Sequence, residues 1–227
     1  GNPVLRVWRM NSAKCFGNTL KSLVIVGHGP SLRGQRLGDR IDACDAVCRM
    51  KWGHLETQVH PEDYGRRTDY LCSTLKTWRG YWTMRLKEYW GYQNFPGQDA
   101  SLDKIRGHFG KTPVRLESEA IQHWLAVYRG MADVRVTHES ADGTHAKEGD
   151  EPWFSTGFGA IVIAAAGIKP GAIFLAGFDN TMSGVREGYK SVFRADAHSY
   201  PRHNWTVEHD MLPMVAKHYG ITICQLP

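Results

Sequence analysis

The segment that most constrains the fold is a short apolar run, Leu23–Val26, followed directly by the turn Gly27-His-Gly-Pro-Ser31. An uninterrupted run of apolar, largely β-branched residues is typical of a strand that is buried on both faces. Glycines at the end of such a strand allow a tight turn and let a ligand approach the backbone, while Ser31 can cap a short helix after the turn. The segment therefore predicts a buried strand that opens into a ligand-accessible turn.

Comparable strand patterns recur along the chain and alternate with helical patterns. The predicted strands are Ala46–Met50, Tyr70–Ser73, Ala172–Ala176 and Ile221–Gln225, with Val4–Trp8 as a candidate edge strand. The predicted helices are Ser118–Tyr128, Phe158–Ile168 and Met211–Tyr219, the last one either starting near Asp210 or kinked at Pro213. This alternation predicts the α/β class, as one Rossmann-like, doubly wound domain with a mostly parallel sheet. The chain has 227 residues, 42% of them hydrophobic, which suffices for a single domain over 1–227.

Charge and cysteine content limit the partners and the compartment. The formal charge of +5 and the pI of about 9.0 favour an anionic partner, such as a nucleotide, a nucleic acid, an anionic glycan or a membrane surface. The five cysteines form no C-x-x-C pair, which predicts reduced thiols. The chain opens without a signal-peptide pattern, and its longest apolar run, Ala160–Ile168, is too short to span a membrane. We therefore expect a soluble, cytoplasmic protein whose basic surface can still contact a membrane.

Two segments have the composition of anion-binding turns. The turn Gly27–Ser31 holds two glycines of a G-x-G-x-x-G pattern, but Leu32 stands at the third place, so NAD binding is weakly supported. A different nucleotide-binding loop, or simply a tight strand-to-helix turn, fits the same residues. Ser155-Thr-Gly157 opens a predicted helix, where hydroxyls and N–H groups suit a carboxylate or phosphate, or serve only as a helix cap.

The stretch Ser199–Asp210, before the last predicted helix, carries the best candidate for a catalytic base. The pKa of imidazole lies near neutral pH, so His203 can deprotonate a hydroxyl within its reach. Taken alone, a surface histidine is the simpler interpretation. His198, His209 and Asp210 do not follow a helical metal-ligand spacing such as H-E-x-x-H, so we expect no metal site.

Taken together and in this order, these segments resemble the motifs of the sialyltransferase families. Val24–Leu32 with Arg40–Met50 is similar to the long sialyl motif, including its G-x-G turn and its I-D-x-x-D and V-x-R-M elements. Gly65-Arg-Arg-Thr68 resembles the G-x-R-T element, and Ser155–Asp179 resembles the short motif. His203–Glu208 matches the H-x4-E of the very short motif. Both ends of the chain are also similar to bacterial sialyltransferases that have a G-N-G-P-S-L loop.

The resemblance implies a GT-A-like glycosyltransferase fold and an inverting reaction that needs no metal and no cofactor. The donor would be a CMP-activated ulosonic acid and the acceptor a glycan hydroxyl, with His203 as the general base. Tyr200 and His198 would stabilise the leaving phosphate, and Glu208 and Asp179 would support the site structurally. The residues implied in nucleotide and donor binding are Gly27, His28, Gly29, Pro30, Ser31, Arg49, Lys51, Ser155, Thr156 and Gly157.

Departures from the family pattern bear on the donor and the compartment. The resemblance covers residues 23–73 and 153–226, and asparagine is usual in the family where His28 and Lys51 stand. Since both places contact the nucleotide in the family, CMP-Kdo is an alternative to CMP-sialic acid as donor. The animal enzymes join a cysteine of the long motif to one of the short motif, and this chain lacks that pair. The resemblance thus implies a bacterial, cytosolic enzyme of polysaccharide biosynthesis, at the inner face of the membrane, with a glycan or lipopolysaccharide-type acceptor.

The middle of the chain, residues 74–152, lies outside the resemblance. Aromatic residues crowd 77–95 at partly helical spacing, which predicts either a helix that packs them into the core or an acceptor-binding lid. Residues 96–114 are polar and carry glycine, which favours a loop, and 138–151 are polar without an apolar period. We interpret 74–152 as a helical and loop insertion on the acceptor side of the domain.

Two other functions stay open on the residues alone. A nucleotide-binding or nucleic-acid-binding module without catalysis would use the basic charge and the aromatic residues, although the sequence carries no RNP-like or zinc pattern. An NAD-type oxidoreductase would use the glycine turn. The sialyltransferase-like interpretation involves no nucleic acid.

Overall fold

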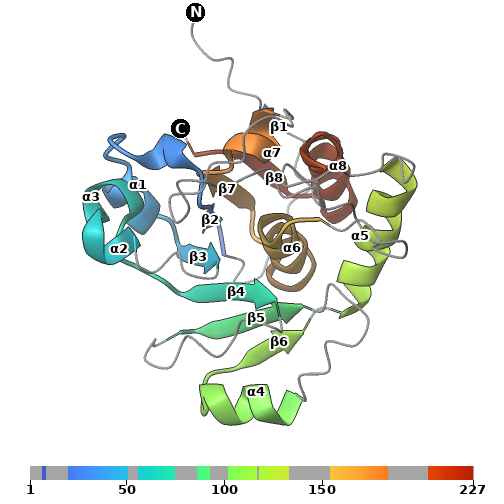
Figure 1. Ribbon diagram of the computed structural model, residues 1–227, viewed down its shortest axis with the longest axis horizontal. Helices are drawn as coiled ribbons and strands as arrows, with labels where there is room; N and C mark the ends of the chain where they lie inside the picture. Colours follow the sequence, from blue (N-terminus) through green and yellow to red (C-terminus); the bar gives the residue numbers. More distant parts are fainter. Residues whose placement is uncertain are drawn as a thin grey trace, which may run out of the picture.

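One sheet of eight strands runs through the protein (Figure 1). The computed structural model describes residues 7–8, 20–50, 56–74, 86–92, 102–116, 118–132, 154–183 and 204–226. The strands are β1 (Val7–Trp8), β2 (Ser22–Val26), β3 (Ala46–Met50), β4 (Tyr70–Thr74), β5 (Glu88–Tyr92), β6 (Val114–Leu116), β7 (Ala172–Ala176) and β8 (Thr222–Gln225). Every neighbouring pair is parallel except β1 and β8, which are antiparallel. The mostly parallel sheet that the sequence predicts is therefore confirmed.

The strand order reverses beside β2, and this reversal marks where a ligand can bind. From β2 the chain adds β3, β4, β5 and β6 on one side, then returns to add β7 and β8 on the other. The sheet is thus doubly wound, as predicted. In such sheets ligands bind at the carboxyl ends of the strands that flank the reversal, here β2 and β7. Val26, at the end of β2, pairs with Ala176 at the end of β7, so the turns after both strands start at one edge.

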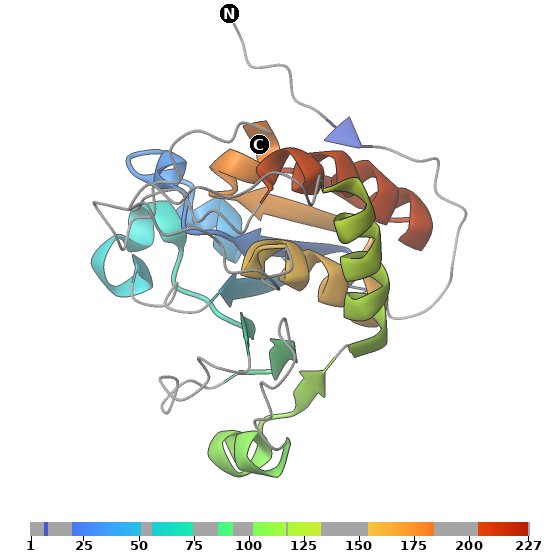
Figure 2. The ribbon, with the colours of Figure 1, turned by 45° about the vertical axis from the view of Figure 1, so that its right-hand side comes forward.

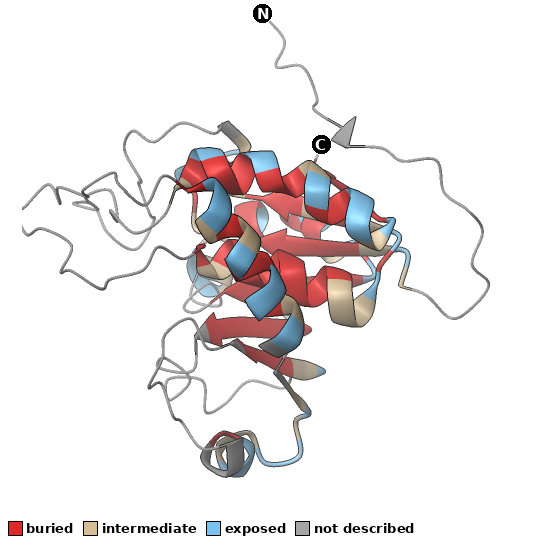
Figure 3. Cartoon of the chain, turned by 90° about the vertical axis from the view of Figure 1, so that its right-hand side faces the viewer, coloured by how far each residue is buried: buried red, intermediate tan, exposed pale blue. Residues whose placement is uncertain are grey.

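Helices cover both faces of the sheet. They are α1 (Gly38–Asp42), α2 (Glu56–Val59), α3 (Pro61–Tyr64), α4 (Leu102–Phe109), α5 (Ser118–Met131), α6 (Thr156–Ile163), α7 (Asp179–Ser183) and α8 (Trp205–Tyr219). α5, α6 and α8 share one core with strand residues such as Ile25 (Figure 2). α1 and α3 pack on the opposite face with residues such as Val24. The residues 157–163 of α6 are all buried, so this helix lies inside the protein rather than on its surface (Figure 3).

The described part of the middle segment differs from the prediction. Residues 88–92 form strand β5 and not a helix, and α4 lies where a loop was expected. Tyr89 and Trp90 are both fully buried. Because successive strand residues point to opposite faces of the sheet, both faces are covered at β5. Trp90 stacks on Tyr70 of the neighbouring strand with ring centroids 4.7 Å apart. The aromatic residues therefore extend the sheet and its core, and a role for 74–152 in acceptor binding stays a prediction.

The boundaries of several other elements also differ from those that the sequence predicts. α8 begins at Trp205, six residues before the expected start, because Asn204 caps it by accepting a hydrogen bond from Val207 N at 3.2 Å. Pro213 is accommodated inside this helix, whose end at Gly220 was predicted correctly. Ser31 does not cap a helix but lies inside a short 3-10 turn, Pro30–Leu32. α7, after the turn that follows β7, is not among the helices that the sequence predicts.

The described cysteines and helices were also compared with the predictions from the sequence. Cys44, Cys48, Cys72 and Cys224 are buried and carry reduced thiols, as predicted for the cysteines. Within the described ranges, every helix falls short of the length and apolar character that a membrane span requires. The cytoplasmic location itself stays a prediction.

Candidate functional site

The glycine turn after β2 packs directly against the turn after β7. Gly27 N donates to the carbonyl of Ala176 at 2.7 Å, and Gly29 N donates to the carbonyl of Gly177 at 2.9 Å. A Cβ atom added at Gly27 would lie only 2.3 Å from the Gly177 oxygen. Glycine is therefore required here by close backbone approach, and the two turns are hydrogen-bonded side by side at the switch point of the sheet.

Asp179 fixes the far end of this turn. The backbone N–H of Ser31 donates to Asp179 Oδ2 at 3.0 Å, and the Ser31 hydroxyl donates to Asp179 Oδ1. A Cβ atom at Gly29 would lie 2.6 Å from Asp179 Cγ, so the carboxylate also packs on the second glycine. These contacts give Asp179 a supporting role beside the turn. The Ser31 hydroxyl donates its hydrogen bond to Asp179, within the protein.

The N-terminus of α6 reaches the same edge. Ser155 caps the helix by accepting a hydrogen bond from Phe158 N at 3.2 Å, as the sequence predicted. A Cβ atom at Gly157 would lie 2.7 Å from the Phe178 ring and 3.2 Å from the Met50 sulfur. The helix start thus lies against the ends of β3 and β7. Because first-turn N–H groups and the helix dipole favour negative charge, this end of α6, with Thr156 half-buried, suits a phosphate or carboxylate.

Glu208 ties the start of α8 to the start of α6. Its Oε1 accepts from Ser155 N at 2.6 Å, and its Oε2 accepts from the Ser155 hydroxyl at 2.9 Å and the Thr181 hydroxyl at 3.2 Å. The side chain is fully buried. The sequence indicated a supporting role for Glu208, but Thr181 was missed, since no local pattern marks a buried threonine two residues after Asp179.

The stability of the protein should depend on pH through Glu208. Burial, only partly offset by the hydrogen bonds from Ser155 and Thr181, raises the pKa of Glu208 from 4.5 to about 7. The folded state therefore holds the proton more tightly than the unfolded state. We expect the contribution of Glu208 to the free energy of unfolding to be largest below pH about 4.5. This contribution should fall by about 3 kcal/mol as the pH rises to about 7, and it should stay level at higher pH.

Urea unfolding at a series of pH values checks this expectation. Glu208→Gln cannot titrate, so its stability should lack the decline between pH about 4.5 and 7 that the unsubstituted protein shows. An equal decline in both proteins would contradict the assignment of this dependence to Glu208.

The ends of β2 and β3 are joined by His28. Its Nε2 donates to the carbonyl of Met50 at 2.8 Å, which places the ring proton on that nitrogen. The ring therefore stands at the edge where the nucleotide is predicted to bind and holds the end of β3 against the glycine turn. Lys51, the next residue predicted to contact the nucleotide, lies outside the described residues.

Arg49 is buried beneath this edge. Its guanidinium donates to the carbonyl oxygens of Tyr64 at 2.7 Å and Arg67 at 3.1 Å, and to the hydroxyl of Thr68 at 3.0 Å. Burial lowers the pKa of Arg49 to about 10, so the side chain stays cationic at neutral pH. These contacts give Arg49 a scaffolding role, and contact with a nucleotide stays a prediction.

The I-D-x-x-D and G-x-R-T elements also form scaffold. The Asp42 carboxylate accepts from the backbone N–H groups of Arg66 and Arg67 at 2.8 and 3.0 Å. Arg67 donates to the carbonyl of Cys44 at 2.7 Å and forms an ion pair with Asp69 at 2.7 Å. Both elements therefore hold the connections between β2, β3 and β4 in place.

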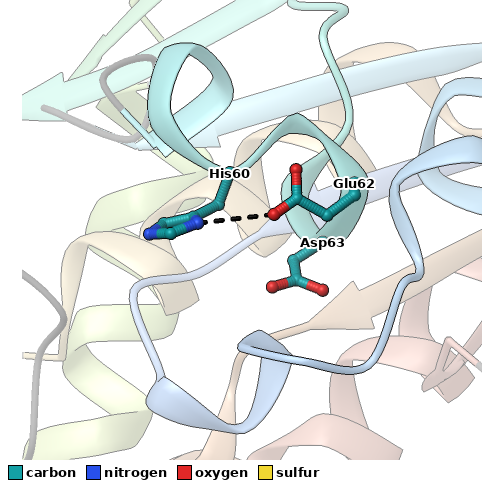
Figure 4. Close-up of side chains that lie close together, drawn as sticks. All are labelled: His60, Glu62 and Asp63. Carbon is teal, nitrogen blue, oxygen red and sulfur yellow. Dashed lines mark hydrogen bonds and ion pairs between the residues drawn. The ribbon is translucent and has the colours of Figure 1, made fainter.

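One group of side chains has the residue types of a metal site. His60, Glu62 and Asp63, around the start of α3, have potential ligand atoms within 4.8 Å of one another (Figure 4). His60 Nδ1 lies 3.4 Å from Glu62 Oε1. The Asp63 oxygens, however, accept from the N–H groups of Gly34 and Arg36 at 2.7 and 2.8 Å. We interpret the group as an anchor for the loop after the glycine turn.

Three predicted catalytic residues lie outside the described residues. They are His198, Tyr200 and the candidate base His203. Asn204, the residue after His203, is described and caps α8, so the base is predicted to precede a helix that Glu208 fixes to the α6 start. The roles of all three residues stay predictions.

A doubly wound sheet with a glycine turn and a helix N-terminus at its switch point places the protein among the Rossmann-like α/β proteins. Residues 6–166 match the sequence profile of glycosyltransferase family 29 (sialyltransferase). The chain belongs to this family. The match runs through 74–152, where the sequence shows no recognisable motif, and ends before His203.

Among solved structures, the chain is similar to a mammalian sialyltransferase crystallised in complex with Gal-beta-1-3GalNAc-ortho-nitrophenol. The two are 15% identical, the match covers 89% of this chain and 68% of that chain, and the TM-score is 0.49. A comparison with curated proteins finds no match. The assignment to the family therefore rests on the profile match, together with the motifs in the sequence.

Proposed function

We propose that the protein is an inverting glycosyltransferase that moves an ulosonic acid, either sialic acid or Kdo, from its CMP-activated donor to a glycan hydroxyl. One observation carries the proposal: the glycine turn and the α6 N-terminus, from segments far apart in the sequence, both pack against Phe178 at the switch point of the sheet. Membership of family 29 supports glycosyl transfer as the reaction. The reaction would take place at the inner face of the membrane, on a glycan or lipopolysaccharide-type acceptor.

The nucleotide would bind at the edge formed by the two turns. Gly27 and Gly29 pack closely against the β7 turn and carry no side chains, so the ligand would approach the backbone of the glycine turn. At the start of α6, the N–H groups of Thr156 and Gly157 would hold the phosphate or the donor carboxylate. Ser155 would support them from within the protein, because its own N–H donates to Glu208. The basic charge of the chain favours the approach of such an anionic donor.

The chemical step would need a base and charge stabilisation. His203 would take the proton of the acceptor hydroxyl as its oxygen attacks the anomeric carbon on the face opposite the CMP leaving group, which inverts the configuration. Tyr200 and His198 would donate hydrogen bonds to the departing phosphate. The proposal assigns the reaction no metal and no cofactor.

Ligand-induced stabilisation tests the nucleotide preference. At about 100 times its dissociation constant, CMP should stabilise the protein by about 2.7 kcal/mol and raise Tm by about 5 to 10 °C. UDP and NAD should have little effect, because the site is proposed to recognise cytidine. CDP should stabilise the protein less than CMP does. Stabilisation by NAD without a response to CMP would instead support the oxidoreductase interpretation, and binding of an oligonucleotide without CMP would support a nucleic-acid-binding module.

A further inference from the structure

The buried tyrosine Tyr128 of α5 contacts residues at the starts of both α6 and α8. Its hydroxyl accepts a hydrogen bond from the backbone N–H of Asn204 at 2.7 Å, across 76 residues of sequence. Its ring lies edge-on to Phe154, with centroids 5.9 Å apart and planes at 85°. Phe154 directly precedes Ser155, and Asn204 directly follows His203. One side chain from the middle of the chain thus touches the neighbours of both motif residues.

The N–H that Tyr128 binds belongs to the peptide unit between His203 and Asn204. A peptide unit is planar, so a hydrogen bond at its N–H restricts the orientation of the whole unit. Asn204 is also the cap of α8, and Glu208, in the first turn of that helix, is bound to Ser155. The start of α8 is therefore held at two points, by Tyr128 at Asn204 and by Ser155 at Glu208.

We propose that Tyr128 is a positioning residue for the catalytic base. Its hydroxyl fixes the N–H of Asn204, where the chain enters α8 directly after His203 in the sequence. The inference rests on the proposed function, in which His203 is the base. A general base acts only within hydrogen-bond reach of the proton it removes, so a small displacement lowers the rate strongly.

Tyr128→Phe tests the proposal, because it keeps the ring against Phe154 and removes only the oxygen. Tyr219→Phe is a matched control: Tyr219 accepts a hydrogen bond from Trp124 Nε1 at 3.2 Å, between the same two helices but at the opposite end of α8. We expect Tyr128→Phe to lower kcat about 10-fold to 100-fold with the KM for the CMP donor unchanged. Tyr219→Phe should retain kcat, with a similar small decrease in Tm.

Amide hydrogen exchange gives a readout that does not depend on the reaction. The Asn204 amide should exchange faster in Tyr128→Phe and at the original rate in Tyr219→Phe. Unchanged exchange at Asn204 in Tyr128→Phe, or an equal loss of kcat in both variants, would overturn the positioning role. Absence of transfer by the unsubstituted protein would instead overturn the proposed function, so the two failures are distinguishable.

Discussion

His203→Ala should reduce transfer from a CMP-activated ulosonic acid by at least about 100-fold, the usual contribution of a positioned general base. CMP affinity should stay nearly unchanged, because the proposed nucleotide contacts come from the glycine turn and the α6 start rather than from this residue. Steady-state kinetics give the first quantity, and calorimetric titration with CMP gives the second.

His123→Ala is the matched control for this substitution. His123 is an exposed histidine on α5, whose ring lies beside those of Trp124 and His218. We expect this variant to retain both transfer and CMP binding. Full activity in His203→Ala would exclude His203 as the base, and an equal loss in His123→Ala would show that the effect is not specific to the site.

Glu208→Ala should have the largest effect on stability. The substitution removes the acceptor for three donors, Ser155 N, the Ser155 hydroxyl and the Thr181 hydroxyl, within a fully buried environment. Each donor left without an acceptor in such an environment costs about 1 to 3 kcal/mol, so we expect a total loss of about 3 kcal/mol or more. Urea unfolding measures this loss.

Asp210→Ala provides the comparison on the same helix. Asp210 is exposed in the second turn of α8, so its removal should change the free energy of unfolding by about 0.5 kcal/mol or less. If Glu208→Ala were no more destabilising than Asp210→Ala, the connection between α6 and α8 would not contribute to stability as the contacts indicate.

Local patterns predicted the parts of the site that depend on neighbours in sequence. The glycine turn after Leu23–Val26 and the cap at Ser155 are both where the residues indicated them. Each feature depends on nearby residues only. Glycine permits close backbone approach, and a serine hydroxyl accepts a hydrogen bond from an N–H in the first turn of the helix that follows.

Contacts between distant residues were not predictable in this way. Glu208 accepts hydrogen bonds from Ser155 across 53 residues, and Tyr128 accepts one from Asn204 across 76, and no sequence pattern indicates that these residues pair. β5 was missed for a related reason, since clustered aromatics fit a helix or a strand until the neighbouring strands decide which faces are buried. For Trp90, the deciding neighbour is the buried Tyr70 of the adjacent strand, on which the Trp90 ring stacks.

The proposed glycosyl transfer is tested most directly by an assay with the purified protein in EDTA, supplied with CMP-sialic acid or CMP-Kdo and a panel of glycan acceptors. We expect release of CMP together with a glycoside of inverted anomeric configuration, from one of the two donors, at a rate that EDTA does not lower. Transfer from neither donor, or a product that retains the anomeric configuration, would contradict it.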